Sequence, residues 1–143
     1  MNKMKLILTE EHFMSKTVNE HYKKLHTHST GSEAARDAFV EQFVQKSLIT
    51  DLGNKRITQI DQQGDAAQII GYGNNSPMHF TVKEGAVEYC KIANDELYAA
   101  TQKYPGWLYG YATLPVADVV ASVAELERCV TELGFKGAIF NGG

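Results

Sequence analysis

The feature that most constrains the fold is a repeated order of elements along the chain. Short apolar runs typical of strands alternate with longer segments in which apolar residues recur at helical spacing. Such alternation is typical of a parallel sheet with packed helices, joined by right-handed crossovers. We therefore expect an α/β fold with helices at 84–103 and 118–133 on one side of the sheet. Four parallel strands are expected in chain order, near residues 5–9, 67–72, 107–112 and 136–140.

Local signals place further helix boundaries. Thr30 and Glu33 have the spacing of a capping box, which predicts a helix from about Glu33 to Lys46. A short helix at 56–63 is expected to stop at Gly64, and Asp118 is a suitable N-cap for the last helix. The buried stripe of that helix is predicted to consist of Val119, Val123, Leu126, Val130 and Leu133.

The strand count leaves two architectures open. Four strands with intervening helices make half of a (β/α)8 barrel, which needs about 250 residues. A self-contained doubly wound sheet is the alternative, and its edge strands would need covering. Because the fourth strand runs into the turn Asn141–Gly142–Gly143, we favour the N-terminal half of a TIM-type barrel. On this interpretation residues 1–143 form one partial domain, interrupted after the fourth strand, whose open edges favour a homo-oligomer.

Composition excludes several classes of partner. The formal net charge is -3 and no basic stripe is present, so nucleic acid is not an expected partner. No apolar stretch approaches the roughly 20 residues that span a bilayer, and no signal-peptide core precedes Glu10. Cys90 and Cys129 lie on apolar helix faces, as buried thiols do in a reducing compartment. We therefore expect a cytoplasmic protein that does not contact membranes.

The most specific chemical feature is Glu10-x-His12, which follows the first apolar run. In a strand, residues two apart point the same way, so a carboxylate and an imidazole would project together toward one divalent ion. His26-Thr27-His28 has a second metal-type spacing but lacks a preceding strand, which favours an ordinary surface loop. The sequence contains neither a glycine-rich phosphate loop nor a serine nucleophile elbow.

Longer segments carry a resemblance to a known family. They are Leu8–Phe13 (LTEEHF), Ala93–Leu97 (ANDEL), Tyr104–Gly106 (YPG) and Glu125–Ala138 (ELERCVTELGFKGA), which continues to Gly142. With these segments the whole chain resembles the amidohydrolase-2 family. Within that family it is similar to the metal-dependent decarboxylases of hydroxybenzoates such as γ-resorcylate and 2,3-dihydroxybenzoate.

The resemblance implies a TIM-type barrel that holds a divalent metal, zinc or manganese. The family's metal-binding Glu-x-His pair corresponds to Glu10 and His12, and its substrate-contacting Asn corresponds to Asn141. A further His and an Asp come from later strands in the family, and this chain ends before them. The implied reaction is the non-oxidative decarboxylation of a small hydroxylated aromatic carboxylic acid, chelated by the ion through its carboxylate and ortho-hydroxyl oxygens.

Two alternatives to this function stay open. The first is a family member that hydrolyses another small carboxylic acid, because the loops at 26–28 and 71–79 depart from the decarboxylase pattern. The second is a non-catalytic half-barrel that serves as a binding or oligomerisation module. On either interpretation the isolated chain is expected to be inactive, since two ligands are fewer than the three that catalytic zinc sites use.

Overall fold

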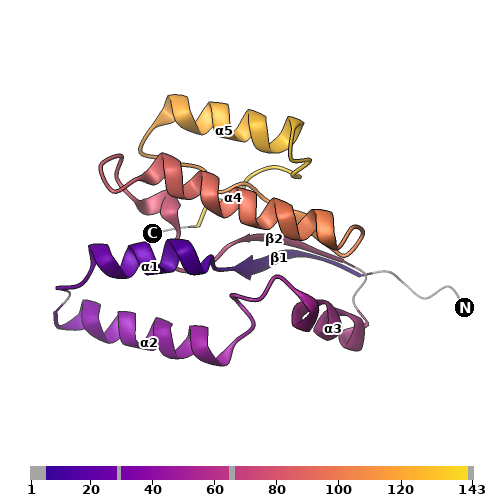
Figure 1. Cartoon of the computed structure of the whole chain (residues 1–143), viewed down its shortest axis with the longest axis horizontal. Coiled ribbons are helices and arrows are strands. Elements are labelled where there is room, and N and C mark those ends of the chain that lie inside the picture. The colour runs from indigo at the N-terminus through magenta and orange to yellow at the C-terminus, as the bar shows by residue number, and fades with distance from the viewer. Residues whose placement is uncertain (1–5, 29, 65–66, 142–143) are drawn as a thin grey trace, which may run out of the picture.

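The computed structural model describes residues 6–28, 30–64 and 67–141 and shows a three-stranded parallel sheet with helices. The strands are β1 (Ile7–Phe13), β2 (Ala67–Tyr72) and β3 (Leu108–Gly110), in chain order across the sheet. The helices are α1 (Lys16–Leu25), α2 (Ser32–Lys46), α3 (Asn54–Gln63), α4 (Ala86–Lys103) and α5 (Val119–Thr131), with a short 3-10 helix, η1, at Pro77–His79. The parallel α/β architecture is confirmed (Figure 1).

The predicted fourth strand is reduced to a single bridge. Ala112 and Ala138 pair in parallel, and the Ala112 amide donates to the Gly137 carbonyl at 2.8 Å. The segment therefore lies beside β3 in the expected direction without forming a regular ladder. Ile139 packs against β2, and a Cβ added to Gly71 of that strand would lie 2.5 Å from the Ile139 Cγ2 atom.

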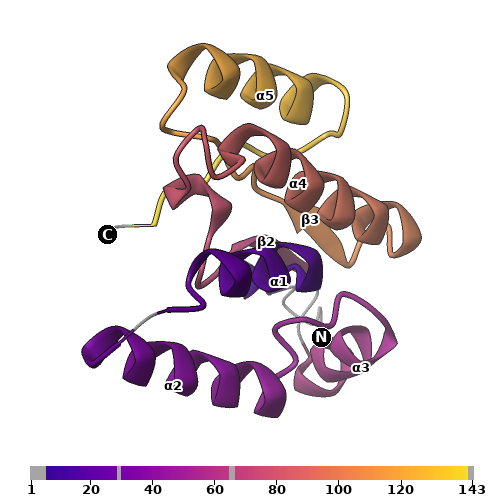
Figure 2. The ribbon, with the colours of Figure 1, turned by 60° about the vertical axis from the view of Figure 1, so that its left-hand side comes forward.

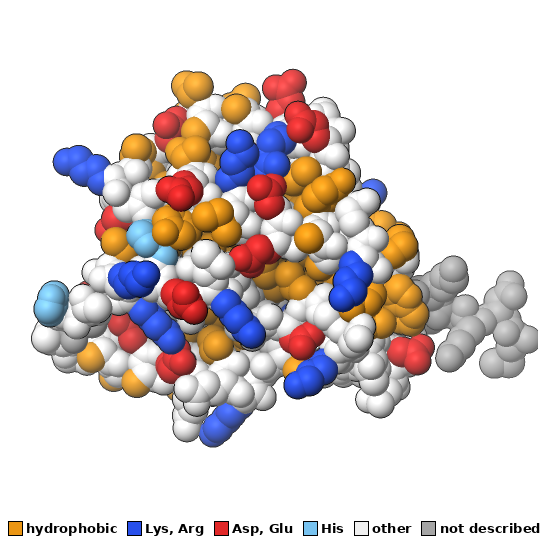
Figure 3. All heavy atoms as spheres, viewed as in Figure 1, with side chains coloured by type: hydrophobic (Ala, Val, Ile, Leu, Met, Phe, Trp, Pro, Cys, Tyr) orange, Lys and Arg blue, Asp and Glu red, His pale blue; other side chains and the backbone are white. Residues whose placement is uncertain are grey.

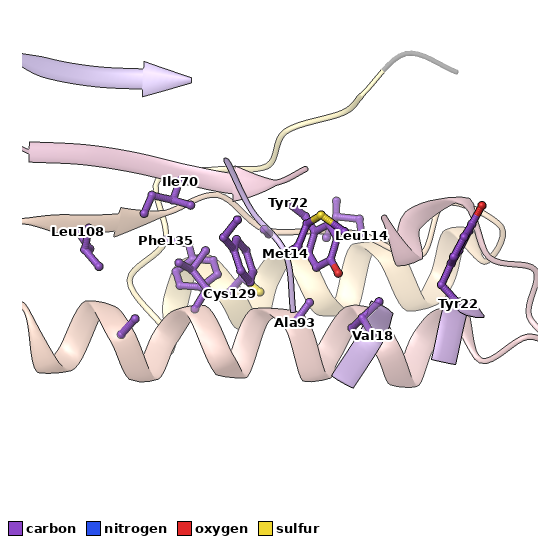
Figure 4. Close-up of a cluster of buried hydrophobic side chains, with 14 of the residues drawn as sticks. Met14, Val18, Tyr22, Ile70, Tyr72, Ala93, Leu108, Leu114, Cys129 and Phe135 are labelled. Carbon is purple, nitrogen blue, oxygen red and sulfur yellow. The ribbon is translucent and has the colours of Figure 1, made fainter. Parts of the chain in front are cut away.

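One face of the sheet packs against α4. Ile70, Tyr72 and Leu108 point from the strands toward the helix, which presents small residues such as Ala93 (Figure 4). Phe13 lies against Tyr72 with ring centroids 5.1 Å apart, and Leu97 is fully buried beneath the sheet. Each such large side chain contributes about 1.5–3 kcal/mol on burial. This layer is the hydrophobic core. Helix α5 lies beside α4 on the same side of the sheet (Figure 1).

A buried polar network joins α4 to α5. The Asn94 amide nitrogen donates to Glu125 Oε1 at 2.8 Å and to the Thr113 carbonyl at 2.9 Å. Arg128 donates from Nη2 and Nε to the two Glu125 oxygens and from Nη1 to Asp95 Oδ1. Burial acts to raise the pKa of Glu125, but the hydrogen bonds from Arg128 and Asn94 outweigh it and the pKa is lowered. The network fixes which face of α5 meets α4.

The predicted buried stripe of α5 is confirmed in part for Leu126 and Leu133, which are partly buried against the core, and is wrong for its valines because of this network. Val119, Val123 and Val130 are 74%, 63% and 45% exposed, whereas Glu125 and Cys129 are buried. At about 100° per residue, the buried face lies roughly a third of a turn from the valines. The valines leave an apolar surface on the outer side of α5, and Figure 3 shows apolar side chains along the edge of the molecule where that helix lies.

Other boundaries show where local signals held and where they failed. Asp118 caps α5 by accepting from the Ala121 amide at 2.9 Å, and Gly64 ends α3 with φ +75°, both as predicted. The Thr30–Glu33 capping box does not form, because α2 begins after Gly31 without a side-chain cap. Helix α1 was not predicted. Strand β1 continues to Phe13 instead of ending near residue 9.

We predict that Gly110→Ala destabilises the protein by about 1–3 kcal/mol, because an added methyl overpacks a filled site. A Cβ at this position would come within 2.7 Å of the Phe135 ring. Urea unfolding would measure the change. Gly53→Ala is the control, since its nearest neighbour would be 3.4 Å away and its φ of -111° suits alanine. A shift of more than about 0.5 kcal/mol in the control, or none at Gly110, would contradict this packing.

Acidification should weaken the α4–α5 contact through Glu125. Because the folded-state pKa of Glu125 lies below its ordinary value of 4.5, its stabilisation is complete above that pH and is lost as the pH falls through the folded-state pKa. We expect Glu125→Gln to lower stability at neutral pH by about 1–3 kcal/mol and to flatten the loss of stability on acidification. Thermal melts as a function of pH would measure both. Glu127→Gln, at an exposed position on the same helix, should change neither.

Candidate metal centre at the carboxyl end of the sheet

The candidate site lies at the carboxyl ends of the parallel strands. His12 is half-buried near the end of β1, where it pairs with Gly71 of β2. Phe13 points into the core, so alternation along the strand places His12 on the opposite face of the sheet. That is the face corresponding to the interior of a closed barrel. In barrels of this kind, active sites are built at the carboxyl ends of the strands.

Glu10 lies in an irregular part of β1. Leu8 pairs with Gln68 and Glu11 pairs with Ile70, so β1 contains one more residue than β2 between these two pairs. Such bulges re-aim side chains and are frequent beside active sites. Glu10 is exposed in the middle of β1, two residues before His12. The sequence alternation alone did not reveal this bulge.

The two side chains offer part of a metal coordination sphere. A carboxylate oxygen and an imidazole nitrogen are suitable donors for zinc or manganese. Within the described ranges no cluster of three or more His, Cys, Asp or Glu side chains could hold an ion. The donor types therefore fit a divalent metal, whereas their number falls short of a complete site.

His12 is held in a crowded backbone environment. Its carbonyl oxygen accepts from Arg56 Nη2 at 2.9 Å, and Arg56 is only 6% exposed. On the other side, a Cβ added to Gly73 would lie 3.3 Å from the His12 Cβ. Neither Arg56 nor Gly73 carries a local sequence signal, because both act through contacts between distant segments.

Asn141 is brought to the same edge of the sheet. Its Nδ2 donates to the Tyr72 carbonyl oxygen at 2.9 Å, at the carboxyl end of β2. The residue is half-buried and follows the strand-like segment that pairs with β3. His12 and Asn141 thus both lie next to the carboxyl end of β2, whereas Glu10, the third predicted site residue, lies in the middle of β1.

The remaining histidines lie elsewhere. His26 caps the end of α1, where its Nδ1 is 2.9 Å from the Tyr22 carbonyl and its ring stacks on Tyr22. His28 is exposed in the following turn. His21 stacks on Tyr89 with ring centroids 3.8 Å apart, and His79 is exposed at the end of η1. These positions favour structural or surface roles for all four.

Two other features do not form the site. A cavity of about 130 Å³ between α1 and α2 is lined by residues such as Tyr22, Asp37 and Asn75, and it contains neither Glu10 nor His12. Cys90 and Cys129 are fully buried, and burial raises the pKa of each thiol to about 12. The predicted burial of both cysteines is confirmed. Among the described residues, no helix has the length and apolarity to span a membrane.

Comparison with known proteins decides the family. The profile of Amidohydro_2, described as amidohydrolase, matches residues 26–143. The chain belongs to this amidohydrolase family. Because the match begins at His26, Glu10 and His12 precede it. The role of Glu10 and His12 as metal ligands therefore stays a prediction.

Relatives of this amidohydrolase include decarboxylases of hydroxybenzoates. A γ-resorcylate decarboxylase from Rhodococcus jostii is 34% identical over 97 residues, which cover 68% of this chain and 30% of the relative. A 5-carboxyvanillate decarboxylase from Novosphingobium aromaticivorans, complexed with manganese and 4-hydroxy-3-methoxy-5-nitrobenzoic acid, has a TM-score of 0.84 at 26% identity. That similarity covers 97% of this chain and 42% of the solved one.

A third relative is also much longer than this chain. The dihydroxybenzoic acid decarboxylase from Polaromonas with bound manganese and the inhibitor 2-nitroresorcinol has a TM-score of 0.73 at 27% identity, covering 98% of this chain and 39% of that one. The amidohydrolase chain thus spans less than half the length of the relatives it matches. Its sheet and helices are consistent with half of a barrel.

Proposed function

We propose that this amidohydrolase chain forms the N-terminal part of a metal-dependent lyase that decarboxylates a hydroxylated aromatic carboxylic acid. The observation that carries the proposal is that His12 lies near the carboxyl end of β1, with Glu10 two residues before it on the same strand. The same architecture occurs in decarboxylases solved with manganese and nitro-substituted phenols. The donor pair and the fold thus point to one class of site.

Three residues of this chain have roles in the proposed mechanism. Glu10 and His12 hold a divalent ion, zinc or manganese, which when bound supplies Lewis acidity and orients the substrate carboxylate. We assign substrate contact to Asn141, whose Nδ2 would exchange its bond to the Tyr72 carbonyl for one to the substrate. The residue that protonates the ring carbon is not assigned among residues 1–143. The buried free thiols of Cys90 and Cys129 favour a reducing compartment, and we place the function in the cytoplasm.

A hydrolase acting on another small carboxylic acid is the second candidate. It is favoured by the family description itself, which is amidohydrolase. The same metal pair would serve it, because a bound ion can polarise a carbonyl as well as orient a carboxylate. Turnover of a hydroxybenzoate by a completed barrel would decide between the two.

Metal titration tests the pair. We expect the isolated chain to bind manganese weakly, since it offers two ligands, and His12→Ala to abolish that binding. His28→Ala is the matched control, because His28 is an exposed histidine outside the site. Isothermal calorimetry on the three proteins gives the comparison. Equal binding by the wild type and His12→Ala would show that the ion lies elsewhere.

The same prediction extends to turnover. The isolated chain should release no carbon dioxide from 2,6-dihydroxybenzoate with manganese added. A fusion of this chain to the remaining strands of the Rhodococcus jostii relative should be active and should lose activity on His12→Ala but not on His28→Ala. A fusion that keeps its activity on His12→Ala would show that His12 is not a metal ligand. Activity of the isolated chain would show that its site is not partial.

We also propose that the isolated chain self-associates. The outer valines of α5, including Val120 at 81% exposure, form an apolar surface. Exposed apolar area is unfavourable by about 25 cal/mol per Å². Analytical ultracentrifugation should show oligomers that Val123→Glu with Val130→Glu shifts toward monomer, while Ala34→Glu at an exposed position of α2 does not. A wild-type monomer at high concentration would refute this.

A further inference from the structure

Arg56 is a buried cation whose contacts converge behind the candidate metal strand. It lies in the first turn of α3 and is 6% exposed. Its Nη2 donates to the His12 carbonyl at 2.9 Å, and its Nε donates to the Asp51 carbonyl at 2.7 Å. Weaker contacts reach the Leu48 carbonyl at 3.2 Å and Gln68 Oε1 at 3.3 Å. One side chain thus ties together β1, the segment between α2 and α3, and β2.

Arg56 carries a buried positive charge. Within the described part of the chain, no carboxylate lies within ion-pair distance of its guanidinium. Burial lowers the pKa of Arg56, and the negative charges of Glu11 and Asp51 partly offset this. Desolvating a cation costs free energy that bonds to carbonyls return only in part. An apolar side chain of similar length would fill the space without that cost, so packing alone does not explain the arginine.

Arg56 binds β1 next to the point where the pairing of β1 with β2 is irregular. The bulge between Leu8 and Glu11 interrupts regular pairing with β2 just before His12. The Arg56 bond anchors the His12 peptide from outside the sheet, immediately after this irregularity. On the sheet side, the Gly73 amide donates to the carbonyl of Phe13, the residue after His12, at 2.8 Å. The backbone that carries the imidazole is therefore fixed from two directions.

We propose that Arg56 is a positioning residue that holds the His12 backbone so that its imidazole is oriented toward a divalent ion. The inference rests on the proposed function, because it assumes that His12 is a ligand. Groups that orient a metal ligand typically change metal affinity by about 10–100-fold when they are removed. Fixing the peptide lowers the entropy lost when the ligand engages the ion.

The test compares two Arg→Met variants of the full chain. Manganese affinity would be measured by water-proton relaxation enhancement, with His12→Ala as the baseline. We expect Arg56→Met to bind about tenfold or more weakly than the wild type. Arg128→Met should stay within about twofold, although it removes a comparably bonded arginine. Arg128 is a matched control because it contacts Glu125 and Asp95, on the helices behind the sheet. Folded Arg56→Met with wild-type affinity would overturn the inference.

A second measurement needs no variant and applies if Arg56→Met fails to fold. In the wild-type chain titrated with zinc, the Arg56 Nε–H resonance should shift in proportion to occupancy, together with the His12 ring signals. The Arg128 Nε–H resonance should stay fixed. An unchanged Arg56 signal at saturation would show that the arginine is only structural. Absence of metal binding by the wild type would overturn the proposed function and this inference with it, whereas equal binding by Arg56→Met overturns the inference alone.

Discussion

Burial of one face of the sheet against α4 is the interaction on which the other features depend. Phe13, Tyr72 and Leu108 are almost fully buried, and the small residues of α4 let the helix approach the strands closely (Figure 4). Because the strands are parallel and in chain order, this one contact also aligns their carboxyl ends. Alternation then turns His12 to the opposite face from Phe13. The candidate site is thus a consequence of how the core is packed.

The uncovered face of the sheet and the incomplete set of metal donors have the same explanation. Helix α4 covers its side of the sheet, while the opposite face carries Ile69 and Tyr109 at intermediate exposure and the 58% exposed Ile7 (Figure 2 shows α4 over the sheet). In solved relatives, chains more than twice this length share the same architecture. Further β/α units would be able to cover these surfaces and to supply donors at the same time.

Local patterns predicted the elements whose signals lie within a few residues. The strands at 67–72 and near 108, the cap at Asp118 and the stop at Gly64 follow from short-range chemistry, and all are present. The valines of the α5 stripe were predicted wrongly because the choice of the buried face depends on Glu125, whose charge is satisfied by Asn94 and Arg128. Hydrophobicity ranks a valine above a glutamate for burial, and it carries no information about a partner 31 residues away.

The sequence by itself determined the α/β alternation, the family resemblance and the types of donor that Glu10 and His12 provide. These depend on residue identity and on spacings shorter than one element. Only the tertiary structure decided where the bulge in β1 falls, that Arg56 holds the His12 carbonyl, and that Asn141 reaches the end of β2. The last two are contacts between residues 44 and 69 positions apart. Their formation depends on how the strands and helices pack, which no local pattern of residues specifies.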